Sequence, residues 1–345
     1  VVFFFDPQGI VNGVSNGLKV CETAVIPALF PFMVLSQFAV YSGVGDRLSR
    51  LLKAPVRILF KLPECCAICI ILSFIGGYPV GARMIRTMYA RGDITREQAE
   101  RMSYFCVGAG PAFVMGMVGN ILFCNQMVGV VIFVSQLVAS LILGIALSLR
   151  SKYIPSVSTK VKKTESFADS IVYAVSDASQ GMTIMCFLVI LFGSVLALLD
   201  GEWLGYIEGA LHMDLDKVKM AISTILEVTN GCISCSKLGG SAILASFAVG
   251  FGGLCVHFQI FASLSDLEMN KAKFVLCRFV SGILSAFFTY ILFKFLPNDM
   301  QVAVVFGNET KFTSASNLLA GVSLILMVVI FLVSIGGKNN GQRRI

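Results

Sequence analysis

The sequence predicts an all-α polytopic membrane protein, an inverted-topology repeat with two re-entrant hairpins and broken helices. Three observations support this fold class. The 345 residues are 56% hydrophobic and 14% charged, with a mean hydropathy of +0.83, whereas soluble domains carry about 25% charged residues. Long apolar runs recur from one end to the other. Runs of glycine, proline and polar residues interrupt these spans at matching places in both halves, and loop charge gives the halves opposite orientations.

The first half begins with "VVFFFDPQ", which we interpret as the end of a membrane helix whose start is absent. A span follows over 13–41, and the basic segment 43–63 is typical of a cytoplasmic interfacial helix. Residues 65–82 are apolar but interrupted, and a second basic segment follows them. Because both flanks are basic, we expect residues 65–82 to enter and leave on the same face as a re-entrant hairpin.

The next elements complete the first half. Thr95 and Gln98 have the spacing of a helix-starting capping box. A span over 102–123, broken near 108–111, runs outward. After the turn "CNQ", residues 127–149 return to a basic cytoplasmic loop.

The second half repeats this order in the opposite orientation. Residues 180–199 run outward to an acidic external loop over 200–216, and 218–240 form a second broken stretch. A span over 241–264, broken at 250–253, leads to Lys271, Lys273 and Arg278, which mark the cytoplasmic side. Two further spans, 274–296 and 316–336, end in a cytoplasmic basic tail. We divide the chain into a first repeat, a basic linker, a second repeat, and an external loop with the last helix and tail (1–150, 151–165, 166–296 and 297–345).

The four interruptions, 76–81, 108–111, 229–231 and 250–253, predict a transport site. Helix N-termini at such breaks present free N–H groups that suit carboxylates or phosphates. Glycines that only allow close helix packing are the alternative. The predicted substrate-binding residues are Gly76, Gly77, Tyr78, Gly81, Gly110, Asn230, Gly231 and Gln259.

Two glutamates are candidates for charge or coupling roles. Glu227 directly precedes "VTNG", and the alternative is a surface pair with Lys219 or Lys237. Glu22 precedes two prolines, and its alternative is a pair with Lys19. His257 is either an interior histidine or a ligand, and Arg83 is interpreted as an interface charge.

Composition and motifs argue against other classes of function. Most of the eleven cysteines lie in apolar runs, so we expect no structural disulfides. "CISC" and "CCAIC" lack accompanying histidines, so we expect no metal, and without a catalytic or cofactor motif we expect no enzyme and no cofactor. The net charge of +7 follows the positive-inside pattern and does not indicate a nucleic-acid partner.

Several blocks in order carry a family resemblance: "GLKVCETAVIPALFPFMVLSQF", "FIGGYPVGAR", "GDITREQAERM", "GAGPAFVMGMVG", "LEVTNG" and "FGGLCVHFQ". They resemble the YlbJ- or SpoVV-type sporulation integral membrane proteins of the wider "Gate", or nucleoside-recognition-domain, group, over about Gly13 to Leu296. The resemblance implies a fold similar to the concentrative nucleoside transporters. It also implies movement of dipicolinic acid across the outer forespore membrane. Glu22 and Glu227 match the family's acidic positions.

The sequence thus favours a secondary transporter of a small organic anion, with dipicolinate as the expected substrate. The alternatives are a cation-coupled nucleoside transporter and, from another class, a non-transporting membrane assembly protein. We expect the lipid bilayer and a coupling H⁺ or Na⁺ as partners and leave a homo-oligomer open. The expected location is the bacterial inner membrane or the outer forespore membrane.

Overall fold

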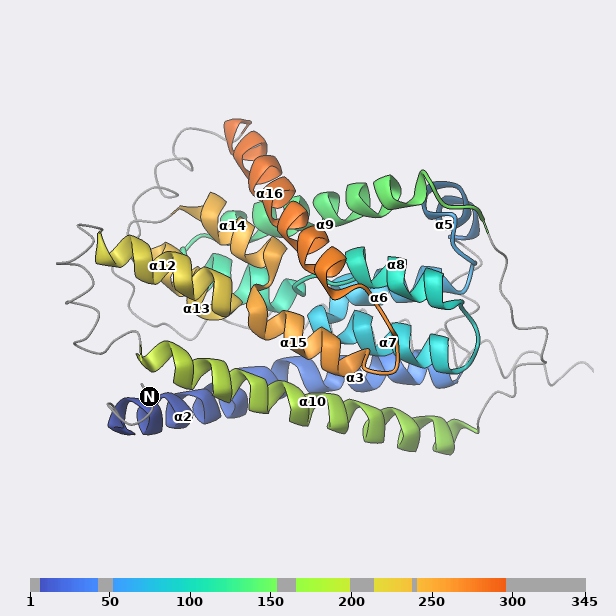
Figure 1. Ribbon diagram of the computed structural model, residues 1–345, viewed down its shortest axis with the longest axis horizontal. Coiled ribbons are helices and arrows are strands. Elements are labelled where there is room, and N and C mark those ends of the chain that lie inside the picture. Colours follow the sequence, from blue (N-terminus) through green and yellow to red (C-terminus); the bar gives the residue numbers. More distant parts are fainter. Residues whose placement is uncertain (1–6, 43–51, 154–165, 199–213, 238–240, 296–345) are drawn as a thin grey trace, which may run out of the picture.

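The computed structural model describes residues 7–42, 52–153, 166–198, 214–237 and 241–295, and throughout these ranges all regular secondary structure is helical (Figure 1). In this part of the chain, four helices are long and apolar enough to cross a membrane: Gln126–Ser148, Phe167–Ala197, Ala242–Ser263 and Lys271–Lys294. The protein is therefore an all-α polytopic membrane protein, as predicted. The predictions for 1–6, 43–51, 154–165, 199–213, 238–240 and 296–345 lie outside the described residues.

The first span is one continuous helix with a π-helical segment in its middle. It consists of α2 (Pro7–Val20), η1 (Cys21–Val25) and α3 (Ile26–Tyr41). The backbone N–H of Ile26 donates to the carbonyl of Cys21, the wider hydrogen-bonding step of a π-helix. Pro27, which has no N–H, follows directly. The helix therefore accommodates Pro27 without ending.

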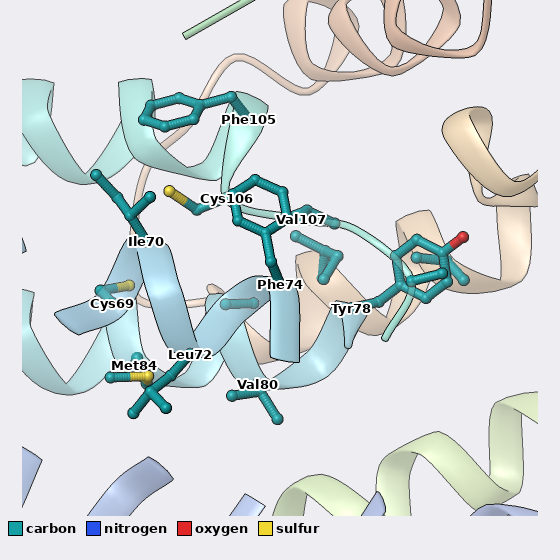
Figure 2. Close-up of a cluster of buried hydrophobic side chains, with 14 of the residues drawn as sticks. Cys69, Ile70, Leu72, Phe74, Tyr78, Val80, Met84, Phe105, Cys106 and Val107 are labelled. Carbon is teal, nitrogen blue, oxygen red and sulfur yellow. The ribbon is translucent and has the colours of Figure 1, made fainter. Parts of the chain in front are cut away.

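The first hairpin turns within the predicted stretch 65–82, but its second arm continues to Ala90. Helix α6 (Cys66–Gly76) ends at Gly77, whose φ of +89° is unfavourable for any residue with a Cβ atom, and α7 (Tyr78–Ala90) starts there. The arms run antiparallel, since a Cβ atom on Gly81 would lie 2.8 Å from the Cβ atom of Ser73. Apolar side chains from both arms, among them Ile70 and Met84, fill the space around the hairpin (Figure 2).

The rest of the first half also follows the prediction. The short α5 (Lys53–Phe60) buries Val56 and Phe60 and is amphipathic. Helix α8 (Arg96–Phe105) starts at the predicted capping box, and residues 106–110 form a break before the π-helix η2 (Ala112–Leu122). Helix α9 (Gln126–Ser148) completes the half.

Two predicted boundaries in the second half are wrong. Helix α10 (Phe167–Ala197) starts thirteen residues before the predicted span, because Ser166 caps it and its small buried residues, such as Ser170 and Ala174, pack against the bundle. The break predicted at 229–231 lies at Glu227, between α12 (Leu215–Leu226) and α13 (Val228–Lys237). Residues 229–231 belong to the first turn of α13.

The last described helices agree with the prediction. Helix α14 (Ala242–Phe251) ends at Gly252, whose φ is +89°, and α15 (Gly253–Ser263) continues the interrupted span. Helix α16 (Lys271–Lys294) follows a short loop. In Figure 1 the hairpin of α6 and α7 and the hairpin of α12 and α13 extend toward the middle of the bundle from opposite ends, while α10 runs along one side.

Polar contacts gather at one end of the bundle, where α5 and the start of α8 lie (Figure 1). Arg86 of α7 pairs with Asp266 at 2.8 Å, and Arg96 of α8 pairs with Glu268 at 2.9 Å. Exposed ion pairs contribute at most about 1 kcal/mol each, so these contacts mark a polar surface more than they stabilise the fold.

This arrangement predicts that Arg57 of α5 and Arg91, at the end of α7, lie on the same side of the membrane. In a background without the native cysteines, Arg57→Cys and Arg91→Cys should both react with a membrane-impermeant maleimide from one side only. A cysteine at Asn125, in the turn before α9, should react from the other side. Labelling of positions 57 and 91 from opposite sides would rule out the re-entrant hairpin.

Candidate functional site

The tip of the first hairpin contacts the break in the span that follows it. A Cβ atom on Gly110 would lie 3.0 Å from the carbonyl oxygen of Ile75 and 3.2 Å from the backbone nitrogen of Gly77. The two interrupted backbones are therefore in contact, and a side chain on Gly110 would force one of them to shift. Glycine at both positions permits this close approach.

The second half repeats this contact. A Cβ atom on Gly253, in the second interrupted span, would lie 3.1 Å from both the Cα atom and the backbone nitrogen of Glu227. Glu227 is the tip of the second hairpin. In each half, a hairpin tip thus packs against the break of the next span.

Tyr78 connects the two halves. Its hydroxyl donates a 2.6 Å hydrogen bond to the carbonyl of Val249, near the end of α14. Its ring lies 3.5 Å from the place where a Cβ atom on Gly252 would be. Figure 2 shows the ring at one end of the apolar cluster, with the hydroxyl directed away from it. The four interruptions that the structure shows therefore meet in one region.

Buried side chains satisfy the polar backbone groups that these breaks leave open. The Gln136 side chain of α9 accepts a 2.7 Å hydrogen bond from the Ala109 N–H and donates one of 2.9 Å to the Ala109 carbonyl. Unsatisfied backbone groups cost several kcal/mol each in a membrane, by order of magnitude. The sequence analysis missed Gln136, although a glutamine within an apolar span is a usable signal.

Arg278 of α16 has a similar role on both breaks. Its guanidinium donates to the carbonyl of Val107 in the first break and to the carbonyl of Gly250 at the end of α14. A longer bond of 3.4 Å reaches the Phe251 carbonyl, which also contacts His257 Nε2 at 3.1 Å. The sequence analysis counted Arg278 among the charges that mark the cytoplasmic side, whereas its side chain is fully buried in the bundle and holds backbone carbonyls.

Glu227 is buried, and its carboxylate caps the N-terminus of α13, the helix that follows it. One carboxylate oxygen accepts from the Thr229 N–H at 3.0 Å, and the other accepts from the Asn230 N–H at 2.8 Å and from the Asn230 side-chain amide at 3.0 Å. The alternative interpretation paired Glu227 with Lys219 or Lys237 at the surface, whereas its partners are Thr229 and Asn230. The carboxylate occupies the N-terminus of α13, so a substrate cannot use those N–H groups while Glu227 holds them. Helices α7, η2 and α15 start without a side-chain cap.

The other predicted site residues lie in three different settings. Gly76, Gly81 and Gly231 pack within or beside the hairpins, where a Cβ atom would meet Val80, the Cys106 carbonyl and Thr224 respectively. Gln259 is buried on α15, and its amide contacts Cys255 Sγ at 3.4 Å. Glu22 lies on η1 with an exposed side chain, so its coupling role stays a prediction.

A buried ion pair joins the first hairpin to α10. Arg83 of α7 contacts Asp177 at 2.7 Å, and the arginine side chain is 2% exposed. The interpretation of Arg83 as an interface charge was therefore wrong. The polar first half of α10, which the sequence analysis placed outside the span, supplies its partner. Breaking such a pair by removing one charge costs about 3–5 kcal/mol, so this contact fixes α7 against α10.

Comparison with known proteins identifies a relative of the same type as the motif blocks indicate. The chain is 25% identical over 321 residues to the sporulation integral membrane protein YlbJ of Bacillus subtilis, covering 84% of this chain and 78% of that protein. This match confirms the resemblance to YlbJ-type proteins. No family model matches the chain, and no solved structure matches it. The YlbJ-type resemblance thus extends over both hairpins and both broken spans.

The contact between Gly77 and Gly110 can be tested against a matched glycine. Gly92 also has a positive φ, but a Cβ atom there would meet nothing within 4 Å. We expect Gly92→Ala to cost only the conformational strain, about 1–2 kcal/mol. Gly77→Ala should cost about 1–3 kcal/mol more, because its backbone (φ +89°, ψ −178°) is essentially confined to glycine and because the new Cβ atom would lie 3.3 Å from the Gly110 nitrogen. Thermal unfolding in detergent compares the stability of the two variants. An equal loss of stability in both would show that Gly77 makes no essential contact.

Glu227→Gln should destabilise the protein by about 1–3 kcal/mol, because the amide NH₂ would take the place of one carboxylate oxygen and face the N–H donor of either Thr229 or Asn230. Asp214 offers a control, since its carboxylate caps the start of α12 with one oxygen, and asparagine caps equally well. Asp214→Asn should therefore leave the unfolding temperature nearly unchanged. Unfolding curves that coincide for wild type and Glu227→Gln would contradict the capping role.

Proposed function

We propose that the chain is a secondary transporter that carries a small organic anion between its two hairpins. The observation that carries the proposal is the meeting of four helix breaks in the middle of the bundle, through Gly77 with Gly110 and Glu227 with Gly253. Discontinuous helices at such a position form the substrate sites of many secondary transporters. Interrupted backbone is tolerated inside a membrane where it is buried in protein or lines a cavity.

The uncapped helix starts favour an anion. Helices α7, η2 and α15 begin at Gly77, Pro111 and Gly252, and contacts of Gly77 with Gly110 and of Gly252 with Tyr78 bring these three starts together. Each start carries a partial positive charge of about +0.5. Three such termini in one region favour the binding of a carboxylate or phosphate.

The proposed substrate is supported by the resemblance to a sporulation membrane protein. Dipicolinate, the pyridine dicarboxylate that the family resemblance implies, has two carboxylates that the uncapped helix starts would bind. Tyr78 and Asn230 lie beside the breaks and could contact its ring and oxygens. We propose the bacterial inner membrane or the outer forespore membrane as the location, with the basic end of the bundle toward the cytoplasm.

One alternative substrate has its own support. The buried carboxylate of Glu227 and the buried amide of Gln259 are hydrogen-bonding groups that would suit a neutral nucleoside, with H⁺ or Na⁺ bound near Glu227 or Glu22. A non-transporting assembly role has less support, because packing partner proteins requires no interruption of membrane helices.

Uptake into proteoliposomes tests the proposal. Purified protein should accumulate labelled dipicolinate above protein-free liposomes, and labelled uridine should not enter faster than in those liposomes. Gly77→Val should abolish uptake because its side chain would separate the breaks. Uptake of uridine alone would favour the nucleoside alternative. Uptake of neither, with the protein folded and correctly inserted, would contradict a transport function for these substrates.

A further inference from the structure

The guanidinium of Arg278 is a buried positive charge that is bound only by neutral groups. Its side chain is 0% exposed, and its three hydrogen bonds go to the carbonyls of Val107, Gly250 and Phe251. Within the described ranges of the chain, no carboxylate lies within 4.0 Å of it. The other fully buried arginine in that part of the chain, Arg83, has Asp177 as a partner.

Carbonyl groups solvate such a charge without cancelling it. The Gly250 and Phe251 carbonyls form the C-terminal end of α14, which has a partial negative charge of about −0.5. This is a favourable place for a cation, but part of the positive charge is left over. A buried charge without a full counter-charge is expensive and is rarely present in a membrane segment without a function.

The position of this charge relates it to the proposed site. The Phe251 carbonyl contacts Arg278, Gly252 contacts the Tyr78 ring, and Gly253 contacts the backbone of Glu227. Three consecutive residues of one break therefore connect the guanidinium to the tips of both hairpins. The Glu227 carboxylate, the opposite charge in this region, is solvated in the same way by the N–H groups of Thr229 and Asn230 at the positive end of α13, and it forms no ion pair with Arg278.

We propose that Arg278 determines the selectivity for anionic over neutral substrates. Its N–H donors hold the break carbonyls, and its unpaired charge supplies the attraction for a carboxylate that binds between the hairpins. The role is exerted through the electric field and needs no direct contact, since the three donors face backbone carbonyls. This inference rests on the proposed function and names the residue that sets its substrate class.

The competing explanation is that Arg278 only holds the break carbonyls in place and has no effect on substrate selectivity. Variants that keep or remove its positive charge distinguish these two explanations. Arg278→Lys keeps the charge but has a different set of donors, whereas Arg278→Gln keeps an amide donor and loses the charge. Arg101 provides the control, because it is a buried arginine of α8 that donates to the Lys61 carbonyl at 3.0 Å, at the polar end of the bundle. Arg101→Gln removes a carbonyl-capping guanidinium away from the breaks.

The experiment measures dissociation constants by calorimetry on the full-length protein in detergent. The probes are pyridine-2,6-dicarboxylate, a dianion, and pyridine-2,6-dicarboxamide, its neutral isostere. Wild type should bind the dianion at least about tenfold more tightly, since one unpaired charge in a protein site contributes about this much. Arg278→Gln should lose most of this preference. Arg278→Lys and Arg101→Gln should keep it within about threefold.

Each outcome decides a different point. If Arg278→Gln binds both ligands with the wild-type ratio, the selectivity role is overturned and the proposed transport stands. If Arg278→Gln does not fold, the lysine variant decides, because loss of the preference in folded Arg278→Lys also overturns the inference. Equal binding of both ligands by wild type overturns it as well. Wild-type protein that binds neither ligand overturns the proposed anion site itself.

Discussion

The structure depends on one constraint, which is that interrupted backbone inside a membrane must find hydrogen-bonding partners within the protein. Four buried side chains supply them. Gln136 pairs with both polar groups of Ala109, Tyr78 donates to the end of α14, Glu227 caps α13, and Arg278 binds carbonyls of both broken spans. Without these partners, each break would leave backbone N–H or C=O groups without a hydrogen bond, and such groups destabilise a protein inside a membrane.

The same partners fix the hairpins relative to each other. Glycine at the contact points lets backbone approach backbone, and Tyr78 and Arg278 connect elements from both halves of the chain. The ion pair of Arg83 with Asp177 fixes the first hairpin against α10. A bundle built this way holds polar backbone, helix termini and two buried charges of opposite sign in one small region, and these properties suit the recognition of a small charged molecule.

The sequence predicted the interruptions well because they depend on local chemistry. Gly77 and Gly252 have positive φ values that favour glycine, so the breaks are visible in the residues themselves. The exact position of the break at Glu227 was missed, because no strong sequence pattern marks a glutamate whose carboxylate caps the helix directly after it. Arg278 and Gln136 could not be assigned, since their partners lie in other spans and depend on tertiary packing. Charge counting grouped Arg278 with Lys271 and Lys273 as a mark of the cytoplasmic side, because it treats every basic residue near a loop alike.

The most direct test of this account is an experimental structure of the protein with dipicolinate bound. We expect the ligand between the hairpin tips, with its carboxylates toward the starts of α7, η2 and α15 and with Tyr78 and Asn230 beside it. Gln136 and Arg278 should still bind the carbonyls of the breaks. Hairpins that cross the whole membrane, or a ligand bound away from the four breaks, would contradict the account.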